Sequence, residues 1–88
     1  PWFVAKCRTS RGSNFDLPVL DLSAGGILVE TGFHAFNVGE RVLVRLPNLS
    51  AIPAEVVWIE DNCAGIAFEQ LLHGAVLEHL MASRACRT

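Results

Sequence analysis

The 88-residue sequence lacks several features that would place it in a common class of protein. It has no apolar run near the ~18 residues that a membrane-spanning helix needs, and no basic, apolar leader at its start. Its three cysteines, Cys7, Cys63 and Cys86, form no C-x-x-C pair, so they indicate neither a disulfide framework nor a zinc site. These absences predict a protein of the reducing cytoplasm without membrane insertion.

Basic and aromatic residues are also scarce. Seven Lys and Arg stand against nine Asp and Glu, which gives a formal net charge of −2, and Tyr is missing altogether. A nucleic-acid-binding face relies on accumulated Lys and Arg, and single-strand binding adds exposed aromatics beside them. The composition therefore argues against a DNA- or RNA-binding protein, while it leaves room for a small local anion site.

Apolar residues are what the chain has in abundance. Hydrophobic residues make up 51% of it and charged residues 18%, which is too apolar for a disordered protein. A chain of this length suits one domain with one modest core. We expect a single domain over residues 1–88, with a β-barrel in 1–68 and a C-terminal helix in 69–85.

Six segments have the alternation and the residue types of β-strands: 2–8, 15–22, 27–31, 41–46, 51–60 and 63–68. Pro18 cannot donate to a β-ladder, so its strand should lie at a sheet edge or contain a bulge. Alternation places Asp21 on the same face as Leu17 and Val19. Six strands in so short a chain predict an antiparallel sheet that curls on itself.

The period changes after the last of these strands. Apolar residues now recur at steps of three and four, as in an amphipathic helix: Leu72, Val76, Leu77, Leu80 and Met81. The pattern predicts a helix over about 70–83 that packs this stripe on an opening of the barrel. Gly74 weakens such a helix by about 1 kcal/mol relative to Ala.

No arrangement of catalytic or metal-binding residues stands out. His34, His73 and His79 are scattered, without the spacing that metal ligands need. Cys63 has no base beside it in the sequence, and both Cys7 and Cys63 fit better as small core hydrophobes. The sequence therefore predicts neither an enzyme nor a metalloprotein, and it indicates no cofactor.

The segment 21–26 combines a carboxylate, a hydroxyl and two glycines between two apolar runs. Asp and Ser favour turns, and Gly reaches positive φ or lets another molecule approach the backbone. Two roles stay open. In the first, Asp21 and Ser23 cap a turn for which Gly25 and Gly26 supply positive φ. In the second they form a recognition site, because a carboxylate can accept two hydrogen bonds from the donor edge of guanine.

These motifs, in this order, resemble those of the PilZ domain, a bacterial receptor module for cyclic di-GMP. Asp21-x-Ser23-x-x-Gly26 is similar to that family's D-x-S-x-x-G motif. A strand with the sequence Val-Val-Trp (56–58) and the sequence Gly-Ile-Ala-Phe (65–68) before the helix are also typical of it. The resemblance implies an all-β fold with a C-terminal helix, namely a six-stranded antiparallel β-barrel of the PilZ-like split-barrel type. It also implies cyclic di-GMP as a regulatory ligand in the bacterial cytoplasm.

The resemblance implies a ligand-binding set of five residues: Asp21, Ser23, Gly25, Gly26 and Trp58. In this set Asp21 reads the guanine base and Trp58 lies near the ligand. Alternation along its strand offers another role for Trp58, on the inward face with Val56 as a core anchor beneath the helix. Both roles for Trp58 stay open.

The family's other motif, R-x-x-x-R, precedes the first strand and clamps phosphates, and it has no counterpart in the chain. Arg8 and Arg11 differ from it in spacing and position. Since Pro1 is not an initiator Met, we expect that the arginines lie upstream. The alternative is a divergent domain that acts as a protein–protein interaction module. Phe33 and Phe36 would then meet a protein partner instead of covering the core, and the oligomeric state stays open.

Overall fold

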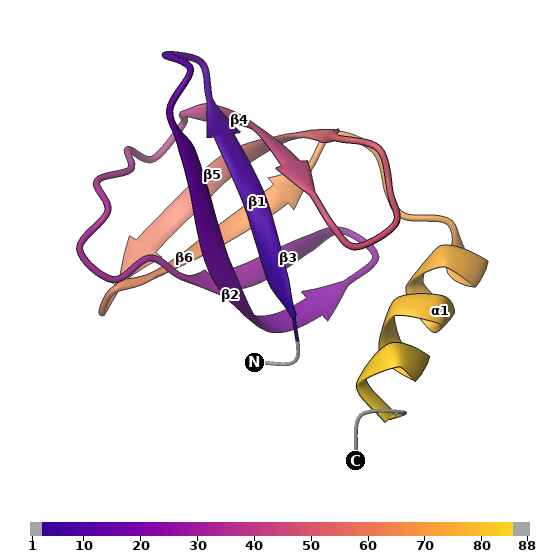
Figure 1. Cartoon of the computed structure of the whole chain (residues 1–88). Coiled ribbons are helices and arrows are strands. Elements are labelled where there is room, and N and C mark those ends of the chain that lie inside the picture. Colours follow the sequence, from indigo (N-terminus) through magenta and orange to yellow (C-terminus); the bar gives the residue numbers. More distant parts are fainter. Residues whose placement is uncertain (1–2, 86–88) are drawn as a thin grey trace.

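The computed structural model describes the backbone of residues 3–85 and the side chains of residues 3–81. It consists of six strands and one helix: β1 (Val4–Thr9), β2 (Asn14–Ser23), β3 (Gly26–Glu30), β4 (Arg41–Arg45), β5 (Ile52–Glu60), β6 (Cys63–Phe68) and α1 (Gly74–Ala85). All neighbouring strands are antiparallel, in the order β1-β2-β3-β6-β5-β4, and β1 also pairs with β4 to close the ring (Figure 1). The predicted six-stranded antiparallel barrel with a C-terminal helix is confirmed.

Regular alternation builds β1 and β4. Exposed and buried residues follow one another strictly in both strands, with Ala5 and Cys7 inward from β1 and Val42 and Val44 inward from β4. A period of two places successive side chains on opposite faces of a strand. The inward positions are therefore apolar, as predicted, except for the buried Thr9 at the end of β1, while the charged residues of these two strands face solvent.

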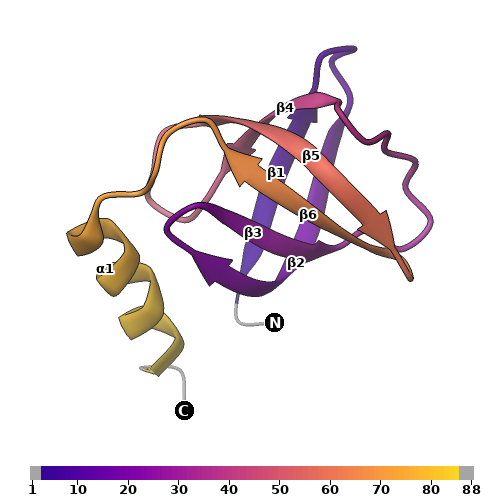
Figure 2. The same cartoon turned by 180° about the vertical axis from the view of Figure 1, so that it is seen from behind.

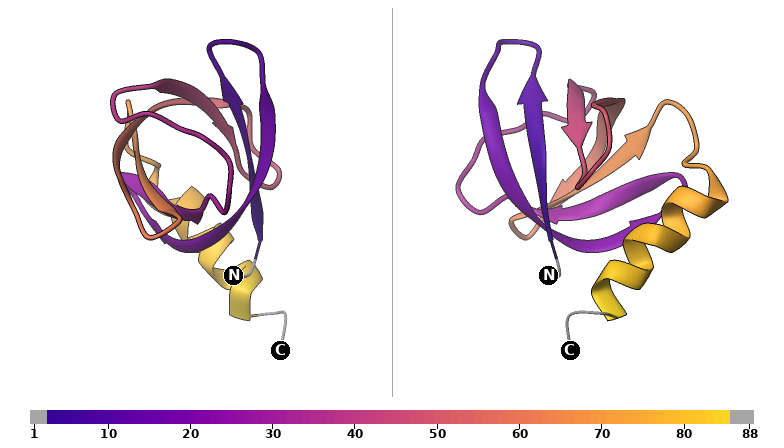
Figure 3. Two further views of the ribbon diagram at one scale, coloured as in Figure 1. Left: turned by 90° about the vertical axis from the view of Figure 1, so that its left-hand side faces the viewer. Right: turned by 45° about the vertical axis from the view of Figure 1, so that its right-hand side comes forward.

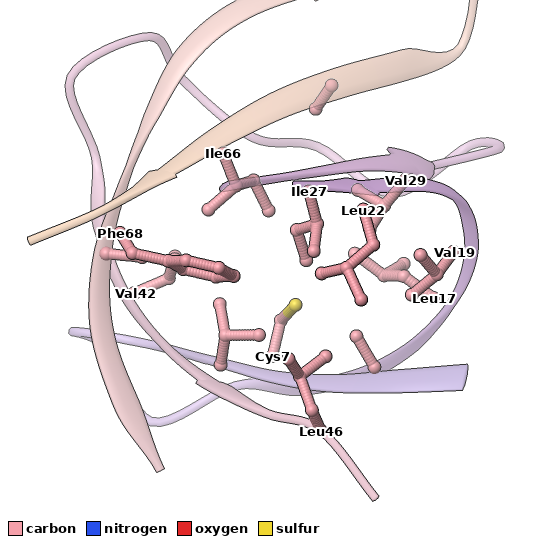
Figure 4. Close-up of a cluster of buried hydrophobic side chains, with 14 of the residues drawn as sticks. Cys7, Leu17, Val19, Leu22, Ile27, Val29, Val42, Leu46, Ile66 and Phe68 are labelled. Carbon is pink, nitrogen blue, oxygen red and sulfur yellow. The ribbon is translucent and has the colours of Figure 1, made fainter. Parts of the chain in front are cut away.

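The barrel encloses one apolar core to which all six strands contribute (Figure 4). Cys7 lies inside this core, and desolvation, with a smaller contribution from the charge of Asp16, raises the pKa of its thiol from 9.0 to about 12. The predicted core role of Cys7 is confirmed. Cys63 is only half-buried and lies outside the core, because it stands at the end of β6 beside the β5–β6 turn.

A β-bulge interrupts β2 between Val19 and Asp21. A bulge adds one residue to a strand, so side chains beyond it face the opposite side. Leu22 is therefore buried and Asp21 is exposed, and the predicted placement of Asp21 in line with Leu17 and Val19 is wrong. The bulge that a proline in this strand predicted is present, whereas the ring of strands leaves no edge at β2.

A second bulge interrupts β5 between Val56 and Trp58. Val56 is fully buried, but the following residues, Val57 to Glu60, are all exposed. Trp58 is 44% exposed and faces outward, so of its two open roles that of a core anchor is excluded, for the same physical reason.

The helix α1 begins at Gly74, four residues later than the periodicity predicted. The amide of Leu72 donates to the carbonyl oxygen of Ala24 (2.8 Å), which holds the preceding segment in a non-helical path against the β2–β3 turn (Figure 3). His73 then caps the helix, because its Nδ1 accepts a hydrogen bond from the amide of Ala75 (3.2 Å). Gly74 thus occupies the first turn, not the helix interior.

The apolar stripe of α1 faces the barrel, as predicted. Leu80 belongs to the buried core, and Leu72, Val76 and Leu77 pack against it from half-buried positions. Met81 marks the border of the stripe, since it is 40% exposed. The helix lies beside the barrel end that carries the β2–β3 turn (Figure 3).

The loop between β3 and β4 treats its two phenylalanines differently. Phe36 packs against the core, with its ring centroid 5.1 Å from that of Phe15 in an edge-to-face arrangement. His34 lies against the same ring at 4.5 Å. Phe33, in contrast, is fully exposed. Of the two roles left open for this pair, Phe36 therefore covers the core and Phe33 does not.

Candidate functional site

A row of four residues crosses four neighbouring strands on the outside of the barrel. Asp21 of β2 stands opposite Leu28 of β3, Leu28 stands opposite Gly65 of β6, and Gly65 stands opposite Trp58 of β5. Adjacent strands lie about 4.8 Å apart, so the row spans roughly 14 Å between its two ends. The two bulges turn Asp21 and Trp58 to the outer face, where both belong to one surface.

A hollow of about 360 Å³ lies on this surface, and all five predicted site residues line it: Asp21, Ser23, Gly25, Gly26 and Trp58. Figure 2 looks toward this side of the barrel, with β5 and β6 in front. Three residues that were not predicted as site residues, Leu28, Gly65 and Ala67, line the hollow too. The cross-strand register brings them there, and no single-strand pattern reports that register.

The Asp21 carboxylate is exposed and has one oxygen engaged. Its Oδ1 accepts a hydrogen bond from the amide of Leu22 (2.9 Å), which fixes the side chain next to the bulge. Its Oδ2 has no partner among the described residues. Asp21 therefore presents a fixed, negatively charged acceptor at the border of the hollow.

The turn after Asp21 is held from two sides. Ser23 Oγ donates a hydrogen bond to the carbonyl oxygen of Gly26 (3.4 Å) across the turn. The carbonyl oxygen of Gly25 accepts from the amide of Phe68 (2.8 Å), and that of Ala24 accepts from the amide of Leu72. The end of β6 and the segment that follows it therefore hold the turn that forms one wall of the hollow.

Neither glycine of this turn has positive φ, so that part of the turn role left open for this segment is wrong. Gly26 is required for space: a Cβ atom there would collide with the carbonyl oxygen of Ile66 and approach Ala67 Cα to 3.2 Å. Close approach is thus the reason for Gly26, but the approaching group is the neighbouring strand. A Cβ atom on Gly25 would meet only Leu71 Cδ2, at an ordinary 3.6 Å.

Gly65 makes room for the indole of Trp58. A Cβ atom on Gly65 would collide with Nε1 and Cε2 of that ring, so the indole lies directly on the backbone of β6. Gly65 itself is buried beneath it. The ring is therefore held at the end of the row with part of its surface open to solvent, which suits stacking against a planar group.

The family model for the PilZ domain matches residues 3–83, nearly the whole chain. The chain belongs to the PilZ domain family. PilZ domains are non-catalytic binding modules, and the family binds cyclic di-GMP. A comparison with curated proteins gives no match.

No cation of the PilZ domain lines the hollow within the described residues, where Asp21 is the one charged group. Arg11 lies at the β1–β2 loop, with its guanidinium 3.8 Å from the carboxylate of Glu40. Arg8 projects from the outer face of β1, on the other side of the barrel. Neither arginine can substitute for the family's phosphate-clamping pair, in agreement with the sequence analysis.

In the described part of the PilZ domain, no three His, Cys, Asp or Glu side chains gather closely enough to hold a metal ion. The helix α1 is not long and apolar enough to cross a membrane.

Proposed function

We propose that this PilZ domain is a second-messenger receptor that binds cyclic di-GMP in the hollow between Asp21 and Trp58. The cross-strand row is the observation that supports it most. A carboxylate with a free oxygen stands at one end and a half-exposed indole at the other. Gly65 has no side chain that would fill the surface between them.

Each end of the row suits a different part of a guanine nucleotide. The Asp21 carboxylate can accept hydrogen bonds from the donor edge of a guanine base, and charge assistance makes such bonds shorter and stronger than neutral ones. The indole of Trp58 offers a flat apolar surface on which a purine can stack. Ser23 adds a hydroxyl at the turn.

Phosphate binding needs cations that the described hollow lacks. We propose that a segment upstream of Pro1 carries the arginines of the R-x-x-x-R motif and that the ligand orders this segment against the barrel. Hydrogen bonds to charged groups contribute roughly 1.5 to 3 kcal/mol each. Two missing arginines would therefore weaken binding by about two to four powers of ten, and the 88 residues alone should bind poorly.

Calorimetric titration of cyclic di-GMP tests this proposal. The 88-residue chain and a chain extended upstream of Pro1 are compared, and we expect clear binding for the extended chain alone. Asp21→Ala should abolish that binding, whereas Asp16→Ala should leave it intact, because Asp16 is an exposed aspartate of the same strand outside the hollow. No heat from the extended wild-type chain would refute the receptor proposal.

A protein–protein interaction module is the second candidate. Two observations favour it: the hollow has no cation among its described lining residues, and the β3–β4 loop exposes Phe33 completely. This candidate becomes the better one if the residues upstream of Pro1 contain no arginines at the family spacing. The sequence of that segment in the gene is the simplest test.

A further inference from the structure

Opposite the hollow, the pairing of β1 with β4 brings together three cations. Lys6 stands directly across from Arg45, and Arg8 follows Lys6 on the same outer face of β1, across from Leu43. Directly opposed residues have Cβ atoms about 4.5 to 5.5 Å apart, and diagonal neighbours about 7 to 8 Å. Like charges at such positions repel one another.

These three cations have no carboxylate partner among the described side chains. The ion pairs there join Arg11 to Glu40 and Arg41 to Glu69. Asp16 stands across from Lys6 on the β2 side, but it forms no ion pair with it. Three unpaired cations thus meet on one face of a chain whose net charge is −2.

The surface over these residues is hollowed along the strands. Two adjoining hollows, of about 400 and 240 Å³, share Lys6 and Arg45 in their linings. A third, of about 380 Å³, continues past Arg8 and Leu43. Apolar surface alternates with the cations, since Val4 is 46% exposed and Leu43 is 42% exposed. We call this surface, made of Val4, Lys6, Arg8, Leu43 and Arg45, the β1–β4 seam.

We propose that the β1–β4 seam binds an extended acidic segment of a partner protein. Residues on one face of a strand repeat about every 6.6 Å, so an extended peptide with acidic residues at alternate positions matches the spacing of Lys6 and Arg8. The residues between these acidic positions point away from the seam. The seam is a cationic surface on a domain with a net negative charge, so an acidic peptide is attracted to the seam and repelled elsewhere.

The composition of the seam favours a peptide over other anionic partners. None of the residues that line its hollows is aromatic, whereas surfaces for single-stranded nucleic acid stack bases on aromatic rings. Clusters that recognise anionic lipids usually contain about four to eight cations, more than the seam carries.

The seam also lies apart from the proposed nucleotide site. In the ring of strands β1 and β4 lie opposite β3 and β6, and β1 is in front in Figure 1 but behind in Figure 2. The proposal therefore does not depend on cyclic di-GMP binding.

Fluorescence anisotropy with a labelled nonapeptide of alternating Glu and Val residues tests the proposal. At low ionic strength we expect saturable binding that a matched Gln-Val peptide lacks and that added salt weakens. Arg45→Gln should weaken binding by about threefold, and the double variant Lys6→Gln/Arg45→Gln by about tenfold. Arg11→Gln removes the same charge outside the seam and should change nothing. Asp16→Asn should strengthen binding, because it removes a carboxylate beside Lys6.

Several outcomes would overturn the proposal. These are equal binding of the Glu and Gln peptides, equal effects of Arg45→Gln and Arg11→Gln, or preferential binding of a single-stranded oligonucleotide or of phosphatidylserine vesicles. Either of the last two would assign the seam to another class of partner. Circular dichroism verifies that the variants are folded, which we expect because all the altered side chains are exposed.

Discussion

The two opposite faces of the barrel rest on the same core but are built in different ways. The face over β3 and β6 is made of small residues, with Gly26 and Gly65 lying where a side chain would strike a neighbour. The face over β1 and β4 carries long cationic side chains on strands without irregularity. On the first face, missing side chains and two flanking bulges form a hollow. On the second face, the regular alternation of inward and outward residues in β1 and β4 is enough to form a charged surface.

The bulges explain why only one face has this character. They interrupt β2 and β5, the strands on either side of β3 and β6, and each turns one candidate site residue outward. Removing a bulge would return Asp21 or Trp58 to the inner face, where an unpaired carboxylate would be costly to bury. The bulges therefore keep Asp21 in solvent and Leu22 in the core, and they bring Asp21 and Trp58 to one outer surface.

The largest effect should come from filling the space at Gly26. Gly26→Ala places a Cβ atom against the backbone of β6, so two strands must separate, and we expect a loss of about 3 kcal/mol in the free energy of unfolding. Gly25→Ala is the matched control, with an ordinary contact only and a change of a few tenths of a kcal/mol. Urea denaturation measures both. Equal stability of the two variants would mean that the small-residue face is not sterically determined.

The core beneath both faces should respond to alkaline pH. The folded pKa of Cys7, about 12, exceeds its unfolded value of 9.0, so the neutral thiol stabilises the fold fully below pH 9.0 and loses that contribution as the pH rises toward 12. Between these values we expect a loss of about 1.4 kcal/mol per pH unit, or roughly 2 kcal/mol at pH 10.5. Urea denaturation across this range should give a shallower decline for Cys7→Ala. Cys63→Ser, at a half-buried position, should decline like the wild type.

Gly65→Ala tests whether the hollow depends on the contact between the Trp58 indole and the backbone of Gly65. The new methyl group should displace the indole, and since that ring is already half-exposed we expect a loss of only about 1 kcal/mol. In a Trp2→Phe background the fluorescence of Trp58 should shift to longer wavelength as the ring enters water. An unchanged emission spectrum would contradict the close contact between Trp58 and Gly65.

The smallest effect concerns the charged face. Arg45→Glu places a carboxylate opposite Lys6 and should stabilise the domain by about 0.5 kcal/mol, because it replaces a repulsive pair by an attractive one. Arg41→Glu is the counterpart: it loses the ion pair with Glu69 and stands opposite Glu55, so it should destabilise by a similar amount. Both changes should shrink in concentrated salt. Destabilisation by Arg45→Glu would show that the cations do not repel.

Much of the fold follows from the sequence because alternation is a strong physical signal. The inward positions of β1 and β4 and the apolar stripe of α1 were predicted from period alone. Pro18 predicted an edge or a bulge for its strand but not the position of the bulge, and nothing in the sequence indicated the bulge in β5. The wrong facing of Asp21 and the open facing of Trp58 both come from these bulges. The start of α1 was missed because a hydrogen bond from Leu72 to a distant turn decides it.

The site was predicted through the family motif more than through local chemistry. The five residues do line one hollow, but the sequence could not show that Gly65 supports Trp58, because that contact depends on the register of β5 against β6. It likewise assigned the wrong physical reason to the turn glycines. Steric limits from another strand cannot be read from a segment by itself.

The hydrogen bond from the Leu72 amide to Ala24 gives the domain a mechanical connection. The turn between β2 and β3 and the segment before α1 share this hydrogen bond, so a displacement of either would strain it. The exchange rate of the Leu72 amide proton reports how often this bond opens. A helix that follows the turn in this way would convert a local event at the barrel surface into a change of orientation at the C-terminal end of the domain.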